Sequence, residues 1–377
     1  MTEKEVAELR RRFRADKSNI THVRGCYVNG NHEIISEFDQ SIAMLGQEES
    51  EMLLTTLRKT LSGTLGRNLM DIEFSTQQVV DSEEHKLLMA LRNSRLEDTD
   101  ALHTFCQKAI QSLSMEDNYL ILLAYDAYDV PCRSKDGETQ EDASGEVFRY
   151  ILCSICPVKL TKAALSYSAI ESCFGHLNPG WAITPPVTGF LFPAFDERST
   201  NLYNALYYTK DAGCNQSAFA DAVFHTEPIM PATVQMESFR SMLGDTLADE
   251  CSYEVVQAVH DSFCELIEEH KAAKVEETLT VSKGTVTRIL KSSGVGEDHV
   301  QAFDRQYDSV FGEDAALPPR NLLNTKQMEI KLSEDVIIRV NSDRTDLVET
   351  RVINGARYIL IRAEDDVEVN GVPIKIR

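Results

Sequence analysis

Two cysteines three positions apart, Cys153 and Cys156, have the spacing that metal sites and thiol redox sites share. A zinc site needs a second ligand pair, and the chain has no second pair at matching spacing. A redox thiol sits at a helix N-terminus, an alternative that Pro157 leaves open. The pair nevertheless falls in a β-prone run at 147–158, where positions i and i+3 face opposite sides. We therefore predict buried structural thiols, with no metal ion and no cofactor.

A short polar run after Pro193 contains two carboxylates and a guanidinium, those of Asp196, Glu197 and Arg198. Polar groups on a loop between two strands often form a ligand site, because the rigid sheet positions them. The same composition also makes an ordinary capped turn. Two interpretations follow: a ligand-binding or catalytic site in the 195–201 loop, or a turn with a structural role alone.

The stretch 275–291 resembles a helix-turn-helix segment, in which one helix ends, a tight turn follows and Ser282 caps the second helix. The outward positions of that second helix would then reach DNA bases and phosphates, namely Lys283, Thr285, Thr287, Arg288 and Lys291. Thr280 stands where such turns commonly have glycine. The alternative is a plain pair of helices packed at an angle.

Several motifs that carry chemistry are missing from the sequence. It has no Gly-x-Gly-x-x-Gly loop, no phosphate-cradling Gly-Lys-Ser/Thr loop and no Gly-x-Ser-x-Gly nucleophile elbow. The sequence therefore favours a binding or regulatory protein over an enzyme.

The chain is strongly acidic, with 60 Asp and Glu against 38 Lys and Arg, a formal net charge of −22. A field of that sign repels nucleic acid and anionic membranes at long range. A local basic patch remains compatible with it, because salt screens charges over roughly 8–10 Å.

The first residues, Met-Thr-Glu-Lys-Glu-Val, include no apolar signal region, and the densest apolar run, at 120–124, is far too short for a bilayer. The nine cysteines are odd in number and predict reduced thiols. We expect a cytoplasmic protein without membrane contact.

The elements that must position these residues begin with alternating helices and strands. Apolar periodicity and an Asn29-Gly30 turn predict a hairpin at 23–38. The same patterns predict helices at 3–15, 49–65, 82–92 and 99–113 and a strand at 69–74. Two long β-prone runs, 119–128 and 147–158, predict a central hairpin buried on both faces, with a polar loop between them.

Further strands fit 164–174, 181–184, 189–195 and 202–208, and the chain becomes helical from about 216, most clearly at 253–270. Gly312, Pro318 and Pro319 suggest a linker at 312–320. Beyond it, a β meander fits 328–332, 335–341, 347–353, 357–361 and 367–376.

Several segments together resemble one protein family. They are 11–20 (RRFRADKSNI), 148–159 (FRYILCSICPVK), 189–201 (GFLFPAFDERSTN), 347–355 (LVETRVING) and 367–371 (VEVNG). The family is a bacterial one, domain of unknown function 4317, found mainly in Gram-positive anaerobes. The resemblance extends over nearly the whole chain and implies a bacterial cytoplasmic protein, but it supplies no reaction, ligand or catalytic residue. A looser likeness to nucleoid-associated proteins rests only on the order of helical and β parts.

The sequence thus predicts an α+β fold in three regions. Residues 1–210 form a mixed N-terminal and central sheet region with helices, 211–315 a helical segment, and 321–377 a small C-terminal β meander. We expect a non-enzymatic binding or regulatory protein, possible partners being DNA or a protein. The alternatives are an enzyme with a site near the 195–201 loop and a protein–protein scaffold or homo-oligomer, which an exposed apolar patch on the C-terminal β region would favour.

Overall fold

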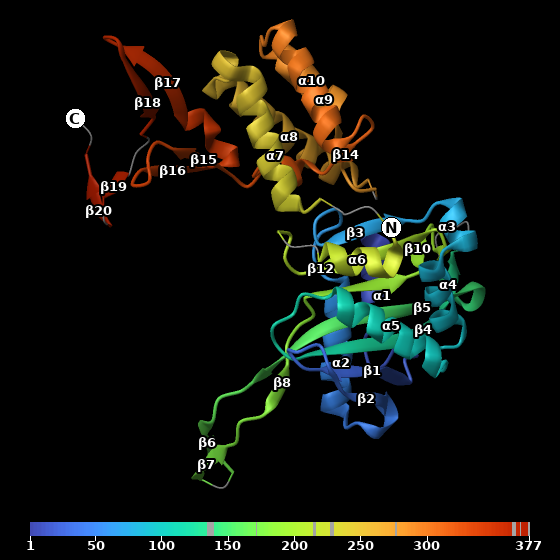
Figure 1. The fold of residues 1–377 in the computed structure, drawn as a ribbon. Helices are drawn as coiled ribbons and strands as arrows, with labels where there is room; N and C mark the ends of the chain where they lie inside the picture. Colours follow the sequence, from blue (N-terminus) through green and yellow to red (C-terminus); the bar gives the residue numbers. More distant parts are fainter. Residues whose placement is uncertain are drawn as a thin grey trace. The chain divides into compact units, whose positions relative to one another are not determined.

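The computed structural model describes residues 1–133, 139–170, 172–213, 216–226, 230–275, 277–363, 367–369 and 371–375. Helix and strand are both abundant, at 40% and 31%, so the predicted α+β class is confirmed. The chain divides into two compact units (Figure 1). Unit 1 is Met1–Ala232 with Glu276–Thr278, and unit 2 is Thr233–Val275 with Leu279–Arg377.

Unit 1 is built on one antiparallel sheet, and the predicted central hairpin forms its middle. The strand order is β2 (Ile34–Ser41), β1 (His22–Val28), β4 (Tyr119–Arg133), β5 (Thr139–Leu160), β9 (Thr188–Phe192), β12 (Asn204–Thr209) and β3 (Leu69–Glu73). A short strand, β8 (Trp181–Ile183), pairs with the end of β5. The predicted hairpin at 23–38 is confirmed as β1 and β2, but the tight Asn29-Gly30 turn is wrong, because a longer loop at 29–33 joins the strands and its positive φ lies at His32.

Helices cover both faces of this sheet, because the inner strands are apolar on both sides. Along β5, Leu152 and Cys156 pack on one face, and Cys153 and Ile155 on the other. The first face is covered by α1 (Glu3–Arg10) and α2 (Gln47–Arg58), with the 3-10 turn η2 (Lys59–Leu61). The second is covered by α4 (Glu83–Asn93), α5 (Thr99–Ser112) and α6 (Ser217–Phe224), with α3 (Thr76–Asp81) beside α4 (Figure 1).

The first helix is shorter than the 3–15 that periodicity predicts. A capping box between Thr2 and Glu5 starts α1, and the helix ends at Arg10. Beyond that point the chain turns, so that Phe13 is buried under the sheet and Arg12 reaches the buried carboxylate of Asp126. Tertiary contacts thus override the helical pattern.

A two-stranded ribbon leaves the sheet after β5. The β signal at 164–174 resolves into two strands, β6 (Ala164–Ser168) and β7 (Cys173–Leu177), which pair with each other. Figure 1 shows this ribbon, here named the arm, standing away from the sheet of unit 1.

The helical part of unit 2 packs around four aromatic side chains, Phe239, Phe263, Phe303 and Tyr307. They come from α7 (Ala232–Leu247), α8 (Tyr253–Ala273) and α10 (Glu297–Phe311), with α9 (Lys283–Ser292) packed beside them. The prediction that 312–320 is only a linker is wrong, because part of this segment packs as regular structure. β14 (Ala316–Leu317) pairs with β13 (Val281–Ser282), and Pro319 starts the short helix α11 (Pro319–Leu322), whose Leu322 is buried.

The C-terminal strands lie close to where the sequence predicts them, and the described ones pair as three separate hairpins. They are β15 (Gln327–Lys331) with β16 (Ile337–Asn341), β17 (Val348–Ile353) with β18 (Ala356–Ile361), and β19 (Val367–Val369) with β20 (Val372–Ile374). The 3-10 segment η4 (Ser342–Leu347) joins the first two and contacts α8.

Candidate functional site

The basic face of α9 is turned toward the acidic side chains of α10. Lys283 Nζ donates to both carboxylate oxygens of Asp308, at 2.5 and 2.7 Å, and this contact raises the pKa of Lys283. Thr287 Oγ1 donates to Asp304 at 2.5 Å, and Lys291 Nζ to Glu297 at 3.1 Å.

The other two proposed DNA-contacting residues are Thr285 and Arg288. Thr285 Oγ1 lies 3.3 Å from the hydroxyl of Ser282, and Arg288 is exposed. DNA contact by Lys283, Thr285, Thr287, Arg288 and Lys291 stays a prediction, one in which phosphate must compete with three carboxylates.

The connection before α9 differs from a helix-turn-helix. Nine residues, 274–282, separate α8 from α9, and β13 occupies the last two of them. The tight turn expected from the sequence is therefore wrong. Ser282 is the N-cap residue of α9 as predicted, but its side chain makes no capping hydrogen bond.

Asp196, Glu197 and Arg198 form the turn between two short strands, β10 (Ala194–Asp196) and β11 (Ser199–Asn201). Glu197 and Arg198 have φ angles of 50° and 61°, as a two-residue hairpin turn requires. The Asp196 carboxylate lies 2.8 Å from the Met1 ammonium and accepts a hydrogen bond from Asn201 at 2.7 Å. Burial lowers the pKa of the Met1 amine, but Asp71 and Asp196 more than compensate, so that this pKa is raised.

Arg198 is the centre of a clamp that holds α1. Its guanidinium donates to Glu8 at 2.5 Å and to the carbonyl oxygen of Pro131 at 3.0 Å, and its backbone N–H donates to Glu5 at 3.2 Å. Asp196 and Arg198 therefore make structural contacts within unit 1, and the Glu197 side chain is exposed. A ligand site at these three residues stays a prediction.

Cys153 and Cys156 are both fully buried and lie on opposite faces of β5, which confirms the prediction of buried thiols. Burial raises the pKa of Cys156 to about 12 and that of Cys153 well above its ordinary value. Because the thiolate is the nucleophile, neither is suited to redox chemistry at neutral pH. Within the described ranges, no group of three His, Cys, Asp or Glu side chains is arranged to hold a metal ion.

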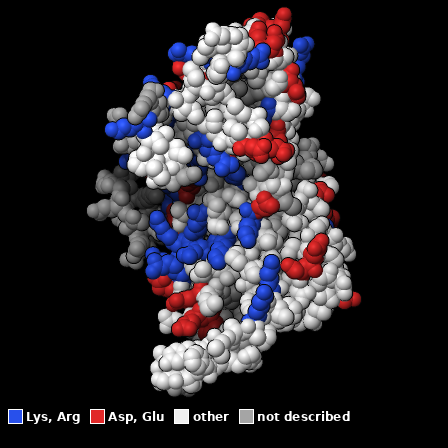
Figure 2. Space-filling view, turned by 90° about the vertical axis from the view of Figure 1, so that its left-hand side faces the viewer, with Lys and Arg blue, Asp and Glu red and all other residues white. Residues whose placement is uncertain are grey.

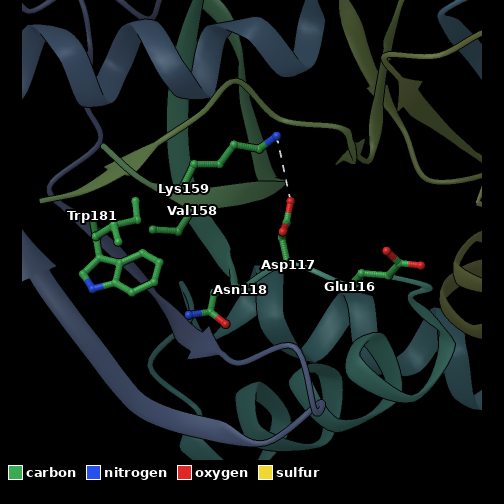
Figure 3. A pocket seen from close by; sticks show the side chains of 7 residues that line it. Glu116, Asp117, Asn118, Val158, Lys159 and Trp181 are labelled. Carbon is green, nitrogen blue, oxygen red and sulfur yellow. Dashed lines mark ion pairs between the residues drawn. The ribbon is translucent and has the colours of Figure 1, made fainter. Parts of the chain in front are cut away.

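A pocket of about 380 Å³ lies at the base of the arm (Figure 3). Its lining is Glu116, Asp117, Asn118, Val158, Lys159, Leu160 and Trp181. Figure 3 shows Trp181 beside Val158, and Lys159 directed toward Asp117, 3.9 Å away. Asn118 is fixed from both ends, since it donates to the Tyr27 hydroxyl and accepts from the backbone N–H of Gly30. Sequence reasoning misses this pocket, whose one distinctive sequence feature is Trp181, the single tryptophan of the chain.

The C-terminal hairpins expose many large apolar side chains. Their exposed fractions run from 42% to 70%, for Leu332, Val336, Ile337, Val352, Ile353, Tyr358, Ile361, Val369, Val372 and Ile374. Only Met328 and Val348 among the hydrophobic side chains of these strands are buried. We name the ten exposed side chains the C-terminal apolar set.

The arm and the C-terminal hairpins share a second property, because both are almost neutral. Residues 160–184 contain one Lys and one Glu, and residues 321–377 contain nine basic and ten acidic side chains, a net charge of −1. Nearly all of the net charge of −22 therefore belongs to the rest of the chain.

Basic side chains are grouped in unit 1 (Figure 2). The segment 52–70 contains Arg58, Lys59 and Arg67 but no Asp or Glu. Asn68 ties this segment to β12 through hydrogen bonds to the carbonyl oxygens of Thr209 and Lys210. Lys59 and Lys210 are exposed, and with Arg67 we name them the basic group.

Comparison with other proteins finds a family and no individual relative. No curated protein matches the chain, and no solved structure matches it. None of the helices in the described ranges is both long and apolar enough to cross a membrane. A family model matches residues 1–372, in agreement with the resemblance seen in the sequence. The chain therefore belongs to the family described as Domain of unknown function (DUF4317).

Proposed function

We propose that this chain is a non-enzymatic binding protein that docks another protein on its C-terminal hairpins. The observation that carries the proposal is the C-terminal apolar set, ten large side chains of which eight lie on the strands of three separate hairpins and two, Leu332 and Val336, in the loop between β15 and β16. Isolated two-stranded hairpins are only marginally stable in water, and exposed apolar patches of several hundred Å² usually mark interaction sites.

The exposed apolar area is of the order that a protein interface needs. If each of the ten side chains exposes on the order of 70 Å², they offer about 700 Å² in total, against ~800 Å² per partner in a standard interface. Neighbours such as Val352 and Ile353 point to opposite faces of their hairpin, so a single partner would cover only part of this area. The near-neutral charge of 321–377 also removes a barrier to docking. Because the rest of the chain is acidic, a neutral or basic partner is favoured over an acidic one.

The test is a matched pair of triple variants in the full chain. The first, Leu332→Ser with Val352→Ser and Val372→Ser, removes exposed apolar side chains from the C-terminal region. The second, Ile35→Ser with Met44→Ser and Val80→Ser, removes three equally exposed side chains from unit 1.

Tagged protein is recovered from its native source, and each co-purified protein is purified and titrated by calorimetry. We expect one stoichiometric partner that binds the wild type and the unit 1 variant alike. The C-terminal variant should bind it at least tenfold more weakly, a loss of about 1.4 kcal/mol. Equal binding by both variants, or no stoichiometric partner for the wild type, would contradict the proposal.

Nucleic-acid association is a second candidate, supported by the grouping of Lys and Arg in unit 1 (Figure 2). It has two possible locations, the basic group and α9. Binding of labelled duplex DNA is measured by anisotropy across a salt series, because phosphate contacts give a steep salt dependence. Loss in Lys59→Glu with Lys210→Glu assigns the contact to the basic group, and loss in Arg288→Ala with Lys291→Ala assigns it to α9. A wild type that does not bind at low salt eliminates this candidate.

A further inference from the structure

We propose that the arm is a self-association element, whose aromatic face packs against the same face of the arm of a second copy. The inference is independent of the proposed docking function, because it concerns unit 1 and a different set of side chains.

The register of β6 and β7 gives the arm two unlike faces. Tyr167 lies opposite Phe174 and Leu165 opposite His176, and directly opposed residues share a face. The rings of Tyr167 and Phe174 are 5.2 Å apart between centroids. The alternate positions Ala164, Ser166 and Gly175 are small and form the other face. The arm thus has the alternation of apolar and small residues that is typical of a strand pair with one buried face.

That patterned face is open to solvent in the single chain. Leu165, Tyr167 and Phe174 are 76%, 59% and 72% exposed, and Ile170 at the tip is 98% exposed. β6 and β7 hydrogen-bond to each other and form a sheet of two strands. A two-stranded ribbon with one apolar face gains stability when that face is covered, because burial removes apolar surface from water.

Insertion of this apolar face into a lipid bilayer is energetically unfavourable. Each strand of a two-stranded ribbon leaves one edge of N–H and C=O groups unpaired, and such edges cost several kcal/mol per group in hydrocarbon. The strong negative charge of the chain also opposes approach to anionic lipid. A protein surface can pair these edges and cover the face at the same time.

The charge distribution favours a second copy as that surface. Two chains of net charge −22 repel each other, but residues 160–184 have no net charge. The strand β6 of the arm alone spans five residues, or about 17 Å, which is about twice the Debye length of roughly 8–10 Å. Contact through the outer half of two arms therefore holds the acidic parts beyond the range of strong repulsion.

The area also fits a reversible dimer. Leu165, Tyr167, Ile170 and Phe174 together expose on the order of 500 Å², so two arms would bury about 1,000 Å² in total. This lies at the small end of specific interfaces. A two-fold axis places each face against an identical one, about 10 Å away, as packed sheets require.

Sedimentation velocity of the full chain over about 1 to 100 µM tests the proposal, with an expected dissociation constant on the order of 10 µM. Tyr167→Ser with Phe174→Ser should weaken self-association at least 30-fold. Met44→Ser with Val80→Ser, equally exposed side chains elsewhere in unit 1, should leave it unchanged. Equal thermal unfolding of the two variants shows that the arm variant is folded, since its side chains lie outside the core.

Three results would overturn the proposal: a wild type that stays monomeric, an arm variant that associates as the wild type does, or arm-dependent flotation with phosphatidylglycerol vesicles. The C-terminal triple variant separates this proposal from the docking function. It should retain the dimer, and loss of the dimer in that variant alone would assign self-association to the hairpins.

Discussion

At the scale of single residues, several charged side chains serve to hold elements together. Asp126 is fully buried in β4, where it accepts hydrogen bonds from Arg12 and from the Tyr150 hydroxyl. The same Arg12 lies over the ring of Tyr128, 5.0 Å from its centroid. A buried carboxylate of this kind is tolerated because its partners compensate the lost hydration.

Arg12→Met should therefore be strongly destabilising, since it leaves the Asp126 carboxylate buried without its cation. We expect a loss of about 3–5 kcal/mol in the free energy of unfolding, measured by urea denaturation. Adding Asp126→Asn should restore part of this loss, because the neutral amide can still accept from Tyr150. A single variant that loses less than about 1 kcal/mol would mean that the pair behaves as an exposed one.

Thiol reactivity should follow burial site by site. Burial holds the pKa of Cys156 at about 12, so at pH 8 only about one molecule in 10⁴ carries the thiolate there. Cys173 on the arm is exposed. Mass spectrometry after brief iodoacetamide treatment should find Cys173 alkylated and Cys153 and Cys156 unmodified until denaturant is added. Early modification of Cys156 would show that β5 opens locally.

At the scale of elements, ion pairs between helices fix how the layers pack. Burial by itself would raise the pKa of Glu84. Hydrogen bonds from Lys108, from its own backbone N–H and from Ser82 have the larger combined effect, and they lower the pKa from 4.5 to about 2. Glu84 lies in the first turn of α4, and its carboxylate is 2.8 Å from Lys108 Nζ on α5. The pair therefore joins two helices that cover the same face of the sheet.

The sign of its pH dependence follows from the lowered pKa. The ionised pair stabilises the fold above the ordinary value of 4.5, and this contribution is lost as pH falls from 4.5 toward 2. Lys108→Met should cost about 0.5–1 kcal/mol at pH 6 and progressively less below pH 4.5. Urea denaturation of both proteins over that range measures the difference. A difference independent of pH would attribute the loss to packing of the lysine stem.

The positions of the helices and strands can largely be predicted from the sequence, but which strands become neighbours in the sheet cannot. Long β-prone runs predict β4 and β5, because a strand buried on both faces needs continuous apolar character. The neighbours β12 and β3 are separated by more than a hundred residues, and no local pattern specifies that they pair.

The same limit applies to the candidate sites. The sequence alone suggests that Lys283 and Thr287 are available to DNA, but the carboxylates that bind them lie 25 and 17 positions further along the chain, respectively. The apolar alternation of the arm predicts strands at 164–174, but only the tertiary structure shows that its aromatic face is uncovered.

At the scale of the whole molecule, apolar exposure and charge are distributed in opposite ways. The arm and the C-terminal hairpins are apolar and nearly neutral, and the remainder carries the negative charge. Association of two identical acidic chains and association with DNA should then respond to salt in opposite directions.

Raising the salt concentration from about 50 to 500 mM should strengthen self-association through the arm, because it screens the repulsion between copies. The same change should weaken any DNA binding, because each counterion released from the phosphates gains less entropy when the bulk salt concentration is high. Sedimentation and anisotropy on one protein preparation measure both. Self-association that weakens with salt would indicate contacts between opposite charges in place of the apolar face.

The clamp at Arg198 has a consequence for synthesis of the chain. It secures α1 with a turn about 190 residues later, and β12 begins 131 residues after β3 ends (204 − 73). At ~5–20 residues per second, translation leaves these early segments without those partners for roughly 7–40 s. The apolar stripe of α1 can pack earlier on α2, β4 and β5, but the edge of β3 stays unpaired until β12 is made, so we expect the nascent chain to bind a ribosome-associated chaperone in that interval.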